Sequence, residues 1–374
     1  MRLDPFQLER YFGEFEFTVP RQLSVSDCDG LGMNELLALA DDETRTLWDG
    51  LTLGYTETQG HPLLRREIAG MYQGFEADHV LVAAPEELIF IAMNSLVHEG
   101  DHVICTFPGY QSLYSVAEAL FAEVTRWEPD EEQGWRFDPE WLADAIRPST
   151  KLIVINFPHN PTGALPNAAD YERIFELALR HDIAIFSDEM YRLLERDPLE
   201  RLPSAVELYD KAVTLSGVSK TIGLAGLRMG WLVTRDAWLM QRLLAVKDYT
   251  TICSSAPSEI LALIGLRARD QLLARHHERI ERNLGLLSGF MDKYEALFSW
   301  VPPRGGTVCF PRFRPASIGT TDLARMAREE AGVLLAPSSV FGYGERHVRL
   351  GVGREAFPEG LVHLSTFLMS KRGS

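Results

Sequence analysis

Short apolar runs rich in β-branched residues alternate with longer amphipathic segments through the middle of the chain. A mostly parallel sheet covered by helices on both faces produces this pattern, because each strand is buried on both sides and a helix crosses over to the next. The predicted strands are residues 79–83, 102–107, 152–157, 183–188, 212–217 and 229–234. Two of them, 152–157 and 183–188, are almost entirely apolar, as central strands should be.

The pattern changes after about Asp236, where long helical stretches take over. The longest runs over residues 270–298 and contains His276 and His277 among charged neighbours, which predicts a solvated face for both. We therefore predict a large α/β domain over residues 46–280. The two ends of the chain, 1–45 and 281–374, are expected to form a smaller α+β domain together.

Composition narrows the class of protein. The 374 residues include 37 Lys and Arg against 53 Asp and Glu, a net charge of −16, which disfavours nucleic acid and anionic membranes as partners. No run approaches the length of a membrane helix, and the first residues lack the pattern of a signal peptide. The four cysteines show no paired spacing, so we expect reduced thiols, no metal site and a cytoplasmic location.

One lysine stands out by its surroundings. Lys220 lies in SGVSKTIGLAGLRMG, residues 216–230, among small residues between two predicted strands. Small residues allow a ligand to come close, and an apolar setting lowers the pKa of a lysine, so that its amine is neutral part of the time. A neutral amine is what Schiff-base chemistry requires. A surface lysine in a glycine-rich loop is the alternative that this segment alone leaves open.

Polar residues follow two of the central strands. Asp188 and Tyr191 stand in SDEMY at the end of one strand, and Asn160 stands in the turn NFPHNPTG after the preceding strand. Open α/β sheets bind their ligands at the carboxyl ends of the strands. Taken singly, an aspartate at a strand end is more often a helix cap or part of a solvated turn, and the NPTG segment alone is only a turn.

Together, in this order and near this spacing, these segments resemble the class I and II aminotransferases, which are fold-type I pyridoxal-phosphate enzymes. The resemblance runs from about Gly32 to the end of the chain. It implies pyridoxal 5'-phosphate as the cofactor, Lys220 as the internal-aldimine lysine and proton shuttle, and Asp188 as the partner of the pyridine nitrogen. It also implies an L-amino acid and a 2-oxo acid as substrates.

Further positions follow from the same resemblance. Asn160 and Tyr191 match the pair that hydrogen-bonds the phenolate oxygen of the cofactor, and Arg228 matches the arginine that binds its phosphate. Tyr110 matches the aromatic residue stacked on the pyridine ring, with core packing as the alternative. Tyr55 matches the tyrosine that reaches the phosphate of the neighbouring subunit, which implies a homodimer with shared active sites.

The substrate carboxylate is expected to bind an arginine near the end of the chain. In HVRLGVGR, Arg349 matches that family position, and Arg354 is a competitor five residues later. Arg349 is favoured because it lies within the strand-like run before the glycine. Substrate selection is also expected to involve residues 24–36, which should line the entrance of the site.

The phosphate-binding turn departs from the family pattern. Where relatives carry small residues, this chain has Ala84-Pro85-Glu86-Glu87; Glu86 and Glu87 are candidates to donate backbone N–H groups at a helix start, or simply stabilise that start. Gly217 also stands where many relatives have a phosphate-binding serine. Ser219 remains beside the lysine, and Ser216 is a possible substitute.

Transamination is the reaction that these residues favour, because an arginine on the carboxylate discourages decarboxylation. Three segments, 156–164, 247–259 and 301–313, are instead similar to the capreomycidine synthase group, which eliminates a β-hydroxyl from an arginine derivative and closes a ring. A third possibility is an effector-sensing regulator with an aminotransferase-like domain. Such proteins carry a DNA-binding domain first, whereas about thirty residues precede the matched region.

Overall fold

The structure, a computed structural model, describes residues 2–371. Its central sheet has the strand order β2-β8-β7-β6-β5-β3-β4; β8 runs antiparallel to both neighbours, and the other strands are parallel. These strands are β2 (Val80–Ala83), β3 (His102–Thr106), β4 (Glu123–Trp127), β5 (Thr150–Asn156), β6 (Ala184–Asp188), β7 (Ala212–Gly217) and β8 (Gly230–Val233). All six predicted strands are therefore present, and the predicted α/β class is confirmed.

Alternation along each strand divides the core between the two faces of this sheet. In β5, Ile153 and Ile155 pack into one apolar cluster, and Leu152 and Val154 pack into another on the opposite face. Side chains of successive strand residues point to opposite faces, so a strand covered on both sides must be apolar at every position. This explains the continuous apolar runs in the sequence.

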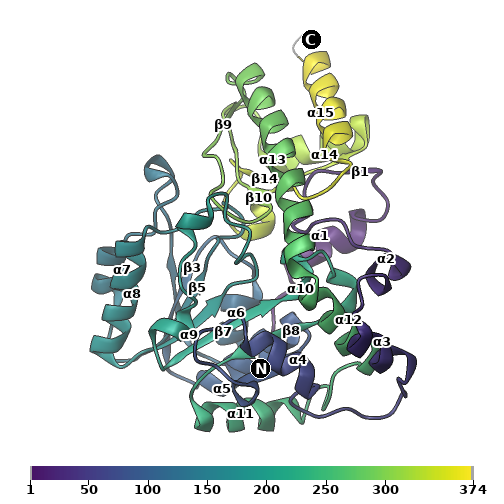
Figure 1. Ribbon diagram of the computed structural model, residues 1–374. Coiled ribbons are helices and arrows are strands. Elements are labelled where there is room, and N and C mark those ends of the chain that lie inside the picture. The colour runs from purple at the N-terminus through teal and green to yellow at the C-terminus, as the bar shows by residue number, and fades with distance from the viewer. Residues whose placement is uncertain (1, 372–374) are drawn as a thin grey trace.

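Helices cover both faces, as Figure 1 shows. Helices α5, α6 and α11 pack on one face, and α4, α8 and α12 pack on the other. The helices are α1 (Gln7–Phe15), α2 (Met33–Leu37), α3 (Asp42–Asp49), α4 (Pro62–Ala69), α5 (Pro85–Leu96), α6 (Ser112–Ala119), α7 (Pro139–Ala145), α8 (Ala168–His181), α9 (Ala205–Leu208), α10 (Val218–Thr221), α11 (Ala237–Lys247), α12 (Ala256–Arg267), α13 (Arg269–Lys293), α14 (Thr320–Ala331) and α15 (Phe357–Lys371).

A second region joins residues from both ends of the chain. One apolar cluster contains Leu23 together with side chains of α13, α14 and α15, and Figure 1 shows α13 extending from the sheet toward α14 and α15. Its strands are β1 (Arg21–Gln22), β9 (Phe298–Ser299), β10 (Val308–Cys309), β11 (Arg312–Phe313), β12 (Val333–Leu334), β13 (Ala336–Pro337) and β14 (Val348–Gly351). Strand β1 pairs in parallel with β12. The exact division at residues 46 and 280 stays a prediction.

Two local features differ from expectation. Strand β4 was not predicted, because an edge strand with charged residues lacks the apolar run of a central strand. His276 is only 2% exposed rather than solvated: its ring faces Gly223, where an added Cβ atom would come within 3.0 Å of Nε2. Within residues 2–371, none of the helices is long and apolar enough to cross a membrane.

Candidate active site

A cavity of about 350 Å³ opens at the carboxyl ends of β5, β6 and β7. Strand ends supply Asn156 and Asp188, the short helix α10 supplies Lys220, and α1 covers the opposite side. The sequence-predicted residues that line it are Glu86, Tyr110, Asn160, Asp188, Tyr191, Ser219, Lys220, Arg228 and Arg349. Residues separated by up to 263 positions therefore meet in one place, as the strand-end argument required.

Lys220 presents its amine to this cavity. Its Nζ donates a hydrogen bond to Oγ of Ser26, 3.0 Å away. Burial lowers the pKa of Lys220, and the nearby carboxylate of Asp27 opposes that shift. Loss of hydration disfavours the charged ammonium, so the site keeps a larger share of the neutral, nucleophilic amine than water would.

Asp188 and Tyr191 approach the cavity from the end of β6. Asp188 is 6% exposed, and one carboxylate oxygen accepts a hydrogen bond of 3.0 Å from the backbone N–H of Met190. Burial raises the pKa of Asp188 to about 6. Tyr191 donates its hydroxyl to the carbonyl of Ser26 at 2.8 Å, and burial raises its pKa to about 12. A cationic partner for Asp188 would reverse the cost of burying its charge.

Arg349 is the buried cation of the site. It is 1% exposed, and its hydrogen-bond partners are neutral: the carbonyl of Ser24 at 2.8 Å and Oδ1 of Asn160 at 3.2 Å. Among residues 2–371 no carboxylate pairs with it. Arg354, by contrast, binds both carboxylate oxygens of Asp27, at 2.8 and 2.9 Å. A guanidinium held in place without an anion is a ready bidentate site for a ligand carboxylate, and Arg349 meets that description where Arg354 does not.

The other end of the cavity suits an anion. Helix α5 begins at Pro85, so the backbone N–H groups of its first turn, including that of Glu86, have no helical acceptor. The hydroxyl of Ser219 is buried and has no hydrogen-bond partner in the described chain. Arg228 is exposed, and among residues 2–371 no acidic side chain forms an ion pair with it. A phosphate group would satisfy all three.

Glu86 does not oppose an anion at this position as strongly as its formal charge suggests. Burial raises the pKa of Glu86 to about 7, and the hydroxyl of Ser112 donates to its carboxyl group at 3.2 Å. A carboxyl group with this pKa is about half protonated near neutral pH, whereas an ordinary glutamate is almost fully ionised. Its charge therefore repels a phosphate less than an ordinary glutamate would.

The glycine at position 217 has a packing reason. A Cβ atom there would lie 3.0 Å from the carbonyl oxygen of Met229 and 3.1 Å from Cα of Gly230, so β7 and β8 pack too closely for a serine. Ser216 does not replace it, because its hydroxyl donates to the carbonyl of Glu189 away from the cavity. Between Ser216 and Ser219, it is Ser219 that lines the cavity.

The structure gives no direct evidence for the predicted cofactor roles of Tyr110, Glu87 and Tyr55, whose contacts in the described chain are as follows. Tyr110 lines the cavity and donates its hydroxyl to Glu9 at 2.9 Å. The side chain of Glu87 turns away and accepts hydrogen bonds from Thr250 and Thr251. Tyr55 is 94% exposed and does not line this cavity. The cofactor roles of these residues stay predictions.

The amino-terminal segment contributes more than the sequence indicated. Glu9 and Glu16, on and just after α1, line the cavity together with Ser26 and Asp27. Residues 24–36 had been expected near the entrance, but the register and the contact of Ser26 with Lys220 were not foreseen. The available signal was the amphipathic pattern of α1, whose acidic positions at 9 and 16 are seven residues apart and so share a face.

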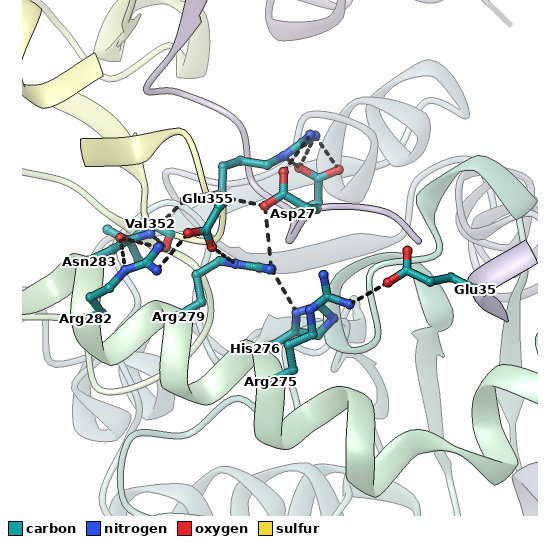
Figure 2. Close-up of polar contacts among 11 residues, drawn as sticks. Asp27, Glu35, Arg275, His276, Arg279, Arg282, Asn283, Val352 and Glu355 are labelled. Atoms are coloured by element: carbon teal, nitrogen blue, oxygen red, sulfur yellow. Dashed lines mark hydrogen bonds and ion pairs between the residues drawn. The ribbon is translucent and has the colours of Figure 1, made fainter. Parts of the chain in front are cut away.

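An ion-pair network holds residues 24–29, here called the strap, against the second region. Asp29 of the strap lies 3.5 Å from the guanidinium of Arg279 on α13. Figure 2 shows Arg279 and Arg282 directed at Glu355, at 3.0 and 2.8 Å. Asn283 donates to two carbonyls of residues 352–354 on the same side. Asp29 thus ties the outer side of the strap to α13, while Ser26 and Asp27 line the cavity.

Comparison with known proteins gives consistent likenesses. Residues 21–357 match the family profile described as aminotransferase class I and II. Capreomycidine synthase from Streptomyces vinaceus is 29% identical over 363 residues, which are 96% of this chain and 92% of that protein. A crystal structure of a PLP-dependent aminotransferase from Streptococcus suis superposes with a TM-score of 0.92 at 31% identity, over 99% of both chains. The PLP-dependent cyclase OrfR gives 0.90 at 29% identity, over 99% of this chain and 98% of its own.

Proposed function

The chain belongs to the class I and II aminotransferases, and we propose that it transfers the amino group of an L-amino acid to a 2-oxo acid, with Lys220 as the amine that carries the cofactor. The cofactor of this enzyme family is pyridoxal phosphate, and the fold is that of the fold-type I transferases. The observation that carries the proposal is Arg349, a buried cation with neutral partners in the same cavity as Lys220.

The residues present fit this cofactor. The unpartnered hydroxyl of Ser219, the start of α5 and the guanidinium of Arg228 would hold its phosphate. Asp188 would face the ring nitrogen, and Asn160 and Tyr191 the ring hydroxyl, with Tyr110 beside the ring. When bound, pyridoxal phosphate supplies an electron sink that weakens the bonds to the α-carbon of the substrate.

Two residues then decide which bond reacts. Arg349 would hold the substrate carboxylate in a bidentate pair, which keeps that group from leaving as carbon dioxide. Lys220, whose pKa is lowered by burial, would take the α-proton on its neutral amine. Ser26, 3.0 Å from Nζ, accepts a hydrogen bond from this amine and would keep it near the α-carbon while it is free. Deprotonation is the step that this arrangement favours.

We also propose a homodimer, in which Tyr55 reaches the phosphate site of the partner. The loops around residues 51–56 and 248–255 are linked by a hydrogen bond from Thr56 to the carbonyl of Ser254. Together they expose four large apolar side chains, those of Leu53, Tyr55, Tyr249 and Ile252. Exposed apolar patches of this kind mark interfaces. Sedimentation of the purified protein at micromolar concentration would show a monomer if this proposal is wrong.

A second candidate reaction is β-elimination with ring closure. It is favoured by the likeness to capreomycidine synthase and to the cyclase OrfR, each at 29% identity over nearly the whole chain. The same residues would serve, because removal of the α-proton by Lys220 also permits a leaving group on the β-carbon to depart. The two reactions give different products. They also differ in that transamination requires a 2-oxo acid acceptor, whereas elimination does not.

The test is a visible absorption spectrum of the cofactor-loaded protein, recorded while L-amino acids are added with and without a 2-oxo acid. We expect the cofactor band to bleach on amino-acid addition and to return when the 2-oxo acid is supplied, with stoichiometric appearance of the new amino acid. Release of ammonia or a cyclised product without any acceptor would support the elimination reaction instead. A band that no amino acid changes would contradict both.

Replacing Asp188 with asparagine should change the free energy of unfolding in opposite directions without and with the cofactor. Folding raises the pKa of Asp188 from 3.8 to about 6, so its contribution to stability is present below pH 3.8 and lost as the pH rises through about 6. Without cofactor, Asp188→Asn should therefore raise the free energy of unfolding at pH 8, by up to about 3 kcal/mol for a shift of about two pH units.

With pyridoxal phosphate bound, the same substitution should destabilise, because the carboxylate would lose its protonated ring nitrogen as a partner. Denaturant unfolding at pH 5 and pH 8, with and without cofactor, measures both signs. An equal effect of the substitution in the two states would contradict the pairing of Asp188 with the cofactor.

A further inference from the structure

We propose that the substrate of this site carries a positive charge on its side chain, a guanidinium or an ammonium, and that Glu9 and Glu16 recognise it. This inference rests on the proposed function, since it concerns the distal end of the amino acid whose carboxylate Arg349 would bind. It assigns to α1, which no part of the proposed chemistry uses, the selection of the substrate.

Helix α1 presents one face to the cavity. Leu8, Glu9, Phe12 and Glu16 all line it, and their spacing places them along one side of a helix and its first following residue. Two of these four positions are acidic. An apolar substrate side chain would need an apolar lining here, and an acidic one would be repelled by both carboxylates.

Other charged side chains of the cavity either form an ion pair or have a contact in the proposed function. Asp27 is paired with Arg354 through both carboxylate oxygens. Arg228 and Arg349 face the two anionic groups, the phosphate and the substrate carboxylate, that the proposed function brings in. Asp188 faces the ring nitrogen.

Glu9 and Glu16 have neither an ion-pair partner in the described chain nor a contact in the proposed function. Neither forms an ion pair with any of residues 2–371, although Glu9 accepts a hydrogen bond from Tyr110. Partial burial raises the pKa of Glu16, with the charge of Asp27 as a further cause. The cations that line the cavity do not come within ion-pair distance of either carboxylate in the described chain, and a cationic ligand would give both a direct partner.

Independent observations show that this cavity is built for a ligand. Arg349 is buried without an anion, and Ser219 is 3% exposed with an unpartnered hydroxyl. Both line the same cavity as the two glutamates. A molecule that satisfies Arg349 with a carboxylate at one end and Glu9 and Glu16 with a cation at the other is an amino acid of the arginine or lysine type.

The experiment compares pairs of amino acids that differ in charge and little in shape: arginine with citrulline, and lysine with norleucine. Dissociation constants for the cofactor-loaded protein are measured by calorimetry, so that no turnover is needed, and kcat/KM is measured alongside. A charged hydrogen-bonded pair contributes about 1.5–3 kcal/mol. We therefore expect the cationic member of a pair to bind about 10- to 100-fold more tightly.

In the variant with Glu9→Gln and Glu16→Gln together, the preference should fall to within about threefold, with the affinity for citrulline and norleucine retained. Glu14→Gln is the matched control, because Glu14 is exposed on α1 and does not line the cavity; it should keep the wild-type preference. The arginine and lysine pairs separate a guanidinium-specific site from a general cation site.

Equal binding of the charged and neutral members in the wild type, or an unchanged preference in the double variant, would overturn the inference. If neutral amino acids still bleach the cofactor band in that case, the proposed function survives on its own. If no amino acid changes the band while arginine binds preferentially, the proposed transfer reaction fails and the cation site stands. Circular dichroism confirms that each variant is folded.

Discussion

Replacing Lys220 with alanine should reduce turnover by at least about 1,000-fold, because the variant lacks both the amine that carries the cofactor and the base that takes the α-proton. Its position supports both roles: Nζ lies within the cavity, burial lowers its pKa, and Ser26 is the hydrogen-bond partner that the structure shows for it. The visible absorbance of the lysine-bound cofactor should disappear with the activity.

Lys211→Ala is a suitable control for this experiment. Lys211 is an exposed lysine nine positions before Lys220. It forms an ion pair with Asp182 and does not line the cavity. The control should keep the spectrum and the activity of the wild type. If Lys220→Ala retained an unchanged visible spectrum, the assignment of the cofactor amine would be wrong, whatever happened to the rate.

Arg349→Ala should lower kcat/KM for amino acids by about 150- to 4,000-fold while cofactor affinity changes little. The guanidinium is buried with neutral partners, so its removal takes away the anchor of the substrate carboxylate and leaves the phosphate contacts intact. Losing one partner of a buried charge pair costs about 3–5 kcal/mol. The fall in kcat/KM should come mainly from a higher KM. Arg349 would hold the substrate carboxylate both before and during proton removal, so kcat should change less.

Two substitutions sharpen that result. Arg349→Lys keeps the charge but not the planar fork, and should recover only part of the loss. Arg354→Ala removes a neighbouring cation that is committed to Asp27, so it should disturb the strap and stability more than KM. Equal loss of cofactor and substrate affinity in Arg349→Ala would mean that the residue supports the fold rather than the substrate.

The sheet was predictable because burial on both faces imposes an apolar residue at every position of a central strand. That rule identified β5 and β6 and, through them, the strand ends that carry Asn160 and Asp188. It could not identify β4, an edge strand whose composition reflects solvent on one side. The burial of His276 was equally hidden, since it depends on a glycine turn, at Gly223, from a distant part of the chain.

The residues of the candidate site could be predicted where they belong to a motif beside a strand. They could not be predicted where they belong to the amino-terminal segment, which docks on the site from far away in the sequence. Lys220, Tyr191 and Arg349 could be placed from local motifs, and all three line the cavity. The approach of Glu9 and Ser26 depends on how the amino-terminal segment docks against residues more than 300 positions later. Periodicity shows that such a helix has a buried face, but not what that face covers.

The strap also sets the order in which the site can be assembled during synthesis. Ser26 leaves the ribosome among the first residues, but the groups that fix its neighbours, Arg349 and Arg354, are made more than 300 residues later. These contacts cannot form before residues 349 and 354 have been made. The seven strands of the central sheet and Lys220 all precede residue 234, so they are synthesised well before the groups that hold the strap over the cavity.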